Sequence, residues 1–158
     1  MHTYQLDLDG KYADIMELCL YNSVLTGISL DGRAFTYVNQ LGSSDTDLSE
    51  RHKWFECACC PPNVSRLLGY LGGYLWTFKS EEKSRASINV HLYSSATLSF
   101  PVEGGEVKAT QKTSWPWHGD VEFTVESPVS IDVDLALRIP AWASEWKVCY
   151  KPWCSLRK

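Results

Sequence analysis

Apolar residues recur at helical spacing in two stretches of the first half of the chain. Over residues 11–26, steps of three and four predict a helix whose buried face consists of Tyr12, Ile15, Met16, Cys19, Leu20 and Val24. A second helix is expected to begin near Pro62, because proline at the first helical position loses no hydrogen bond. Its periodicity continues to residue 78, with a stripe formed by Leu67, Leu68, Leu71, Tyr74 and Leu75.

The segment between these helices is short and polar. Asp31-Gly32 separates two apolar runs and predicts the turn of a tight hairpin, because glycine there tolerates a positive φ. Residues 40–53 are polar and irregular, so we expect a loop.

After a charged connector at residues 79–85 the hydrophobic period changes to two. Five runs are typical of strands: INVHLY, ATLSF, EVKATQKT, DVEFTVE and IDVDLALRIP. Short strands at this spacing predict an antiparallel β-sandwich. The predicted fold class is therefore α+β, with a helical domain over residues 1–85 and a β-sandwich domain over residues 86–158. The tail over residues 145–158 is expected to be unstructured.

Composition narrows the class of partner. The formal charge of −4 is spread along the 158 residues, so no basic stripe indicates nucleic acid and no polybasic run indicates anionic lipid. Residues 1–20 contain four acidic side chains and no apolar block, so they do not form a secretory signal, and no stretch approaches the roughly 18 apolar residues of a membrane span. If the chain is complete, we expect a cytoplasmic protein with reduced cysteines and small, neutral partners. The sequence does not predict an oligomeric state.

Three of the six cysteines, Cys57, Cys59 and Cys60, lie just before the second predicted helix. A helix N-terminus favours the thiolate, which is both the nucleophilic and the metal-binding form. Two adjacent cysteines in a turn can reach one zinc ion, and Cys57, His52 or Glu56 could supply further ligands. The alternative is a set of buried free thiols in a core turn.

The other cysteines have simpler interpretations. Cys19 is expected in the core of the first helix, and Cys149 and Cys154 are expected to be incidental thiols in the tail. A thiol redox function is weaker, since the C-x-C-C spacing lacks the C-x-x-C geometry of the usual oxidoreductases. The high aromatic content suits sugar rings, although core packing uses the same residues.

These motifs resemble a known family. WFECACCPPNVSR, preceded by YADIMELCLYNSVLTGISLDGRAFTYVN and followed by LALRIPAWA, resembles glycoside hydrolase family 127, the β-L-arabinofuranosidase-like enzymes. The resemblance implies that the first domain contains the last helices of an α/α barrel and that a β-sandwich follows. It also implies a retaining glycosidase that acts on an L-arabinofuranoside-type glycan, with a zinc-bound cysteine as nucleophile in place of the usual carboxylate.

The resemblance assigns roles to four residues. Cys59 is the implied nucleophile and a zinc ligand, and Cys60 is a second zinc ligand. Glu17 and Tyr37 match residues that contact the sugar in the family. Without the resemblance, Glu17 would be interpreted as a solvated helix residue and Tyr37 as a half-buried strand aromatic.

The sequence also departs from the family pattern. The Glu-x-Cys motif that supplies the other zinc ligands, and the glutamate that serves as acid/base, have no match in the eleven residues before Tyr12. The expectation is therefore an internal piece of such an enzyme that hydrolyses poorly or not at all alone, since each missing role commonly costs about a hundredfold. The alternative is a zinc-thiolate or carbohydrate-binding module without turnover.

Overall fold

The structure is a computed structural model of the chain, and it describes residues 8–38, 41–42, 44–46, 48–57, 59–81, 85–150 and 153–157. The chain divides into two compact units. The helical unit comprises Ile15–Leu71, and the sheet unit comprises Met1–Asp14 with Gly72–Lys158. Helices and strands organised in sheets make this an α+β protein, as the sequence predicts. Among the described residues, none of the helices is long and apolar enough to cross a membrane.

The first predicted helix forms, but it changes type along its length. The α-helix α2 covers Gly10–Cys19, a π-helical turn follows over Leu20–Val24, and a 3-10 turn covers Leu25–Gly27. Its buried positions are Ala13 and Glu17, four residues apart on one face. The predicted face is therefore wrong in part, since Ile15 is 58% exposed and Cys19 is also exposed.

The second predicted helix is shorter than its periodicity indicates. Helix α3 covers Cys60–Tyr70, two residues earlier at its start than expected, and Leu71 separates it from the single turn α4 over Gly72–Leu75. Of the predicted stripe, Leu75 alone is buried and Leu68 is exposed. The prediction fails after Leu75 because the tryptophan, threonine and phenylalanine that follow favour a strand, and a strand partner is available.

The turn at Asp31-Gly32 is present. Gly32 has φ 70° and donates its N–H to the carbonyl oxygen of Ser29 at 2.8 Å, which closes the turn. Its flanks are paired by a single antiparallel bridge between Ile28 and Phe35. Phe35 also bridges His52, so the predicted loop at residues 40–53 returns to the hairpin near its end.

In the described parts of the chain, eight strands make three sheets. Their bounds are β1 Trp76–Glu81, β2 Arg85–Val90, β3 Ala96–Val102, β4 Gly105–Thr113, β5 Val121–Glu126, β6 Asp132–Leu137, β7 Trp146–Tyr150 and β8 Trp153–Arg157. The strand orders are β1-β2-β6, β3-β4-β5 and β7-β8. The ends of the charged connector belong to β1 and β2, and its middle, residues 82–84, lies outside the described residues.

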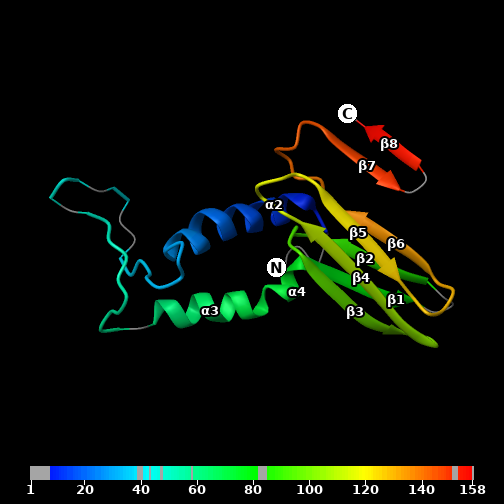
Figure 1. The fold of residues 1–158 in the computed structure, drawn as a ribbon, viewed down its shortest axis with the longest axis horizontal. Coiled ribbons are helices and arrows are strands. Elements are labelled where there is room, and N and C mark those ends of the chain that lie inside the picture. Colours follow the sequence, from blue (N-terminus) through cyan, green and yellow to red (C-terminus); the bar gives the residue numbers. More distant parts are fainter. Residues whose placement is uncertain are drawn as a thin grey trace. The chain divides into compact units, whose positions relative to one another are not determined.

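The two three-stranded sheets pack as layers. Figure 1 shows β3, β4 and β5 lying over β1, β2 and β6, and the ring of Phe78 on β1 stacks on Phe100 of β3 with centroids 4.4 Å apart. Alternate residues of the two central strands are buried, as period-two patterns require: Ala86, Ile88 and Val90 on β2, and Val107, Ala109 and Gln111 on β4. The predicted sandwich is therefore present.

One pairing differs from the antiparallel prediction. Strand β6 lies parallel to β2, with Ile88 opposite Leu135. Between β2 and β6 the chain forms the three strands β3, β4 and β5 of the second sheet, and β6 then runs in the same direction as β2. A long excursion of this kind is what a parallel pair needs, whereas a tight hairpin can join only antiparallel strands.

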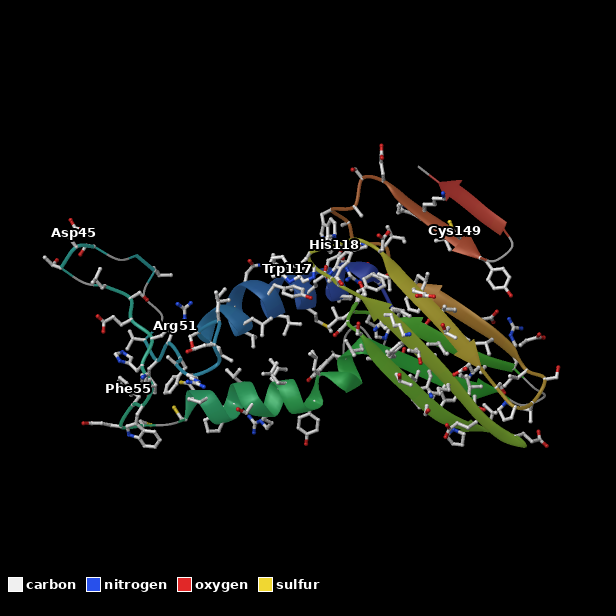
Figure 2. All side chains as sticks on the ribbon, viewed as in Figure 1. Asp45, Arg51, Phe55, Trp117, His118 and Cys149 are labelled. Atoms are coloured by element: carbon white, nitrogen blue, oxygen red, sulfur yellow. The ribbon has the colours of Figure 1, made fainter. Side chains whose placement is uncertain are left out.

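The tail predicted to be unstructured forms a hairpin. Strands β7 and β8 pair antiparallel, and their register places Cys149 opposite Cys154. Cys149, labelled in Figure 2, is disulfide-bonded, so the prediction of an incidental reduced thiol at this position is wrong. Two short strands joined by two residues fit in a segment of this length, which the prediction overlooked.

The sheet unit also contains a buried polar network of Asp14, His91 and Arg138. The Arg138 guanidinium, 2% exposed, forms an ion pair with Asp14 in which Nη1 lies 2.5 Å from Oδ1, and its Nε donates to the carbonyl oxygen of His91 at 2.5 Å. His91 is fully buried, and its Nε2 lies 3.0 Å from the Thr77 hydroxyl. Burial, and secondarily the charge of Arg138, lowers the pKa of His91 to about 4, so the imidazole is neutral at pH 7.

Candidate active site

The start of helix α3 positions the two adjacent cysteines. Cys59 is the N-cap residue and Cys60 the first helical residue, followed by prolines in the first turn, where a missing N–H costs nothing. The Asn63 side chain donates from Nδ2 to the carbonyl oxygen of Cys59 at 2.9 Å, and Arg66 donates to Oδ1 of Asn63 at 2.5 Å. These contacts link the backbone of Cys59 to the second turn of the helix.

Tyr37 comes to these cysteines from the hairpin segment. Its hydroxyl oxygen lies 3.6 Å from Sγ of Cys59, and Sγ of Cys59 lies 3.7 Å from Sγ of Cys60. We call Tyr37, Cys59 and Cys60 the thiol cluster. All three residues belong to the helical unit, and three of the four residues assigned by the resemblance are thus brought together through contacts with Cys59.

Electrostatics within the thiol cluster favour one thiolate. The hydrogen bond from Tyr37 is the largest cause that lowers the pKa of Cys59, followed by hydrogen bonds from Cys60 and Cys57. The pKa of Cys60 is raised, chiefly by its hydrogen bond to Cys59, and hydrogen bonds to Cys57 and Cys59 raise the pKa of Tyr37. Cys59 is therefore the group of the cluster that loses its proton most readily, with Tyr37 and Cys60 as the hydrogen-bond donors to its thiolate.

The spacing of the two sulfurs suits a shared zinc ion. Tetrahedral zinc with Zn–S bonds of about 2.3 Å places two ligand sulfurs about 3.8 Å apart, and the Cys59 and Cys60 sulfurs are 3.7 Å apart. Within the described parts of the chain, no group of three or more His, Cys, Asp or Glu side chains could hold a metal ion. His52 and Glu56, the further ligands considered from the sequence, therefore do not complete a site with these cysteines.

Glu17 and Cys57 have different surroundings. Glu17 lies on α2 and is only 6% exposed, which excludes the interpretation as a solvated helix residue. Burial of a carboxylate is costly unless polar groups surround it, so its position is compatible with a role in a polar site. Cys57 is exposed, like Cys59, and the interpretation of the three cysteines as buried core thiols is wrong.

Two residues of the site were not predicted from the sequence. Phe55 stacks on the Tyr37 ring with centroids 3.9 Å apart and planes 13° apart, and Asn63 binds the Cys59 carbonyl. The signal for Asn63 is its place four residues after Cys59, where a helical side chain can reach back by one turn. No sequence signal relates Phe55 to Tyr37, because their contact depends on the path of the intervening loop.

Comparison with protein families gives two matches that follow one another along the chain. Residues 1–82 match the catalytic domain of the GH127 β-L-arabinofuranosidases, and residues 87–151 match the middle domain of the same enzymes. The chain belongs to the GH127 family. The resemblance inferred from CCPPN and its flanking segments is therefore confirmed.

Individual GH127 proteins support this assignment. A non-reducing end β-L-arabinofuranosidase of Bifidobacterium longum is 38% identical over 152 residues, which include 87% of this chain and 22% of that protein. The crystal structure of a GH127 β-L-arabinofuranosidase from Geobacillus stearothermophilus matches 97% of this chain with a TM-score of 0.77 and 35% identity. A GH127 β-arabinofuranosidase structure matches 89% with a TM-score of 0.71 and 35% identity. This chain spans 25% and 21% of those two chains.

Proposed function

We propose that this chain carries the nucleophile and part of the sugar site of a retaining β-L-arabinofuranosidase. The observation that carries the proposal is the thiol cluster, in which the Tyr37 hydroxyl and the Cys60 sulfur lie 3.6 Å and 3.7 Å from the Cys59 sulfur at the start of α3 in a GH127 chain. An exposed thiol with a lowered pKa is a competent nucleophile. The substrate class, an L-arabinofuranoside, is proposed from the activities in the names of the relatives.

The proposed reaction has two steps. The Cys59 thiolate attacks the anomeric carbon, the glycosidic C–O bond breaks, and its electron pair stays on the leaving oxygen, which takes a proton from a general acid. Water then attacks the same carbon and passes a proton to the conjugate base of that acid, while the C–S bond breaks with its electron pair on sulfur, so the sugar leaves with its original configuration and Cys59 returns to thiolate. The proton donor for the first step is not assigned to a residue of this chain.

The remaining roles at the site are binding of the sugar, binding of zinc and orientation of Cys59. We propose that the Glu17 carboxylate accepts hydrogen bonds from sugar hydroxyls and that Tyr37 contacts the sugar while it donates to Cys59. Cys59 and Cys60 would hold zinc, which keeps a coordinated thiol ionised when it is bound. Asn63 keeps the Cys59 backbone at the first turn of α3, so that its sulfur and that of Cys60 face the same side.

We further propose a place for this chain within the longer enzymes. Helices α2 and α3 correspond to the last helices of an α/α barrel, and a domain boundary lies near residue 85. The positions at which the two family matches end and begin, residues 82 and 87, support this division. Because the acid and the remaining zinc ligands are unassigned, the chain by itself is expected to turn over natural glycosides slowly.

An activated substrate tests the proposal without the missing acid. Dinitrophenolate leaves without protonation, so dinitrophenyl β-L-arabinofuranoside needs only the nucleophile for its first step. In buffer with added zinc, the chain should release about one equivalent of dinitrophenolate, and Cys59→Ala should lower the initial rate at least about a hundredfold. Cys57→Ala is the matched control and should keep most of the rate. Equal release by Cys59→Ala and the unmodified chain would refute the nucleophile assignment.

Metal analysis, taken together with the dinitrophenolate release, separates this proposal from a zinc-thiolate module without turnover. Both hypotheses expect zinc in the purified chain to depend on Cys59 and Cys60 more than on Cys57. Zinc without dinitrophenolate release would favour the module. Release without any dependence on Cys59 would contradict both.

A further inference from the structure

We propose that Phe55 is a positioning residue that holds Tyr37 against the Cys59 sulfur. This inference rests on the proposed function, since Cys59 is the nucleophile assigned there, and it adds a residue outside the CCPPN motif to the site. Phe55 and Tyr37 stack with centroids 3.9 Å apart and planes 13° apart, while the Tyr37 hydroxyl lies 3.6 Å from Cys59 Sγ. Phe55 thus acts on the sulfur only through Tyr37.

Backbone pairing brings the two aromatic residues together. Phe35 and His52 exchange both backbone hydrogen bonds, with N to O distances of 3.0 Å and 2.8 Å. Phe35 lies two residues before Tyr37, and His52 lies three residues before Phe55. Arg51 fixes the same segment, because its Nη2 donates to the carbonyl oxygen of Thr26 at 2.8 Å, in the 3-10 turn after α2. Arg51 and Phe55 are labelled in Figure 2 in this loop, ahead of α3.

Without a partner for its ring, Tyr37 would have two freely rotating side-chain bonds. Its ring is half-buried, and its hydroxyl has the Cys59 sulfur as a distant, weak acceptor at 3.6 Å. A parallel stack against Phe55 restricts both torsions, and the His52 ring, 5.6 Å from the Phe55 ring and tilted by 54°, contacts Phe55 in turn. The orientation of the hydroxyl therefore depends more on this stack than on the sulfur.

The stack also limits how a sugar can use Tyr37. One face of the Tyr37 ring is covered by Phe55, so a sugar cannot stack on that face, and the hydroxyl lies 3.6 Å from the Cys59 sulfur. Because the Tyr37 proton is directed to Cys59, a sugar hydroxyl at this position should meet the Tyr37 hydroxyl oxygen as a hydrogen-bond acceptor beside the nucleophile. Loss of Phe55 should lower the rate of attack more than it weakens binding of the sugar.

Nuclear magnetic resonance of the chain with labelled tyrosine rings tests the contact itself. The Tyr37 signal, assigned by its loss in Tyr37→Phe, should be displaced by the ring current of Phe55 and should shift again when Cys59 is alkylated with iodoacetamide. Iodoacetamide can also alkylate other exposed cysteines, so the part of the shift that is absent in Cys59→Ser is the part caused by alkylation of Cys59. Phe55→Leu should abolish the displacement and weaken the response, while Phe55→Tyr should restore both. The control is Trp54→Leu, which alters an exposed neighbouring aromatic and should change neither.

Release of dinitrophenolate from dinitrophenyl β-L-arabinofuranoside provides the second measurement. Phe55→Leu should lower the maximal rate constant of this single release about 3- to 10-fold with little change in the substrate concentration that gives half the maximal rate, and Phe55→Tyr should restore the rate. If the unmodified chain releases nothing but the Tyr37 signal behaves as expected, the proposed function fails and the positioning role stands. If Tyr37 in Phe55→Leu responds to Cys59 alkylation as in the unmodified chain, or the rate is unchanged, the positioning role is refuted.

Discussion

The thiol cluster of the helical unit and the buried polar network of the sheet unit use polar groups in opposite surroundings. In the network, Arg138 and His91 are buried and their contacts connect strand ends to Asp14 on α2. In the thiol cluster, Cys59 is exposed, and its hydrogen-bond partners lower its pKa rather than contribute to a core. The buried network therefore contributes to the stability of the fold, whereas the exposed thiol cluster is accessible for a chemical reaction.

The largest expected effect is on stability, from Asp14. Asp14→Ala removes the carboxylate that balances the buried Arg138 charge, and we expect a loss of about 3 kcal/mol in the free energy of unfolding. Urea denaturation measures it. The matched control is Asp134→Ala, whose ion pair with Arg85 is exposed on both sides and should contribute under about 1 kcal/mol. Equal losses in the two variants would mean that burial does not distinguish the pairs.

The pH dependence of stability should come from His91 in the network. Its pKa is about 4 in the folded chain and about 6.5 when unfolded, so the unfolded state binds more protons between these values. Stability should therefore fall as the pH is lowered through this window, by about 2 kcal/mol between pH 7 and pH 5. Urea denaturation at several pH values tests this, and His91→Gln should flatten the curve. If the free energy of unfolding of His91→Gln falls as much between pH 7 and pH 5 as that of the unmodified chain, the pH dependence comes from other groups.

The smallest effect is expected on the reactivity of Cys59. Tyr37→Phe removes the largest cause of its lowered pKa, so less thiolate is present at a given pH and alkylation should need a higher pH. Peptide-resolved alkylation by iodoacetamide in metal-free buffer measures this, with Cys59 modified at lower pH than Cys60 in the unmodified chain. Tyr70→Phe, at an exposed tyrosine of α3, should leave the profile unchanged. The same pH profile of Cys59 alkylation in Tyr37→Phe and in the unmodified chain would contradict the contact between Tyr37 and Cys59.

The sequence predicts the parts of this fold that depend on local patterns. Period-two alternation locates β2 to β6, and glycine predicts the turn at Gly32. It does not predict that Trp76–Glu81 leaves the helical period to pair with β2, or that β6 is parallel to β2, because strand partners are distant in sequence. Helical periodicity also placed Ile15 and Cys19 in a core, whereas the face through Ala13 and Glu17 is the buried one.

The candidate site was predictable to the extent that its motif is contiguous. Cys59 and Cys60 are adjacent, and their place at the start of a helix follows from the prolines that succeed them. The contact of Tyr37 with Cys59 was implied only indirectly, through a shared sugar site, and the stack with Phe55 was not predicted. Both depend on the bridge between Phe35 and His52, which no periodicity encodes.

The proposed function depends on a covalent bond between Cys59 and the sugar. The most direct measurement is peptide mass spectrometry of the chain after incubation with zinc and β-L-arabinofuranosyl fluoride, whose leaving group needs no strong acid. One pentosyl group should be attached to Cys59, and none to Cys57 or Cys60. A pentosyl group on a carboxylate, or the same adduct yield in Cys59→Ala, would contradict the proposed function.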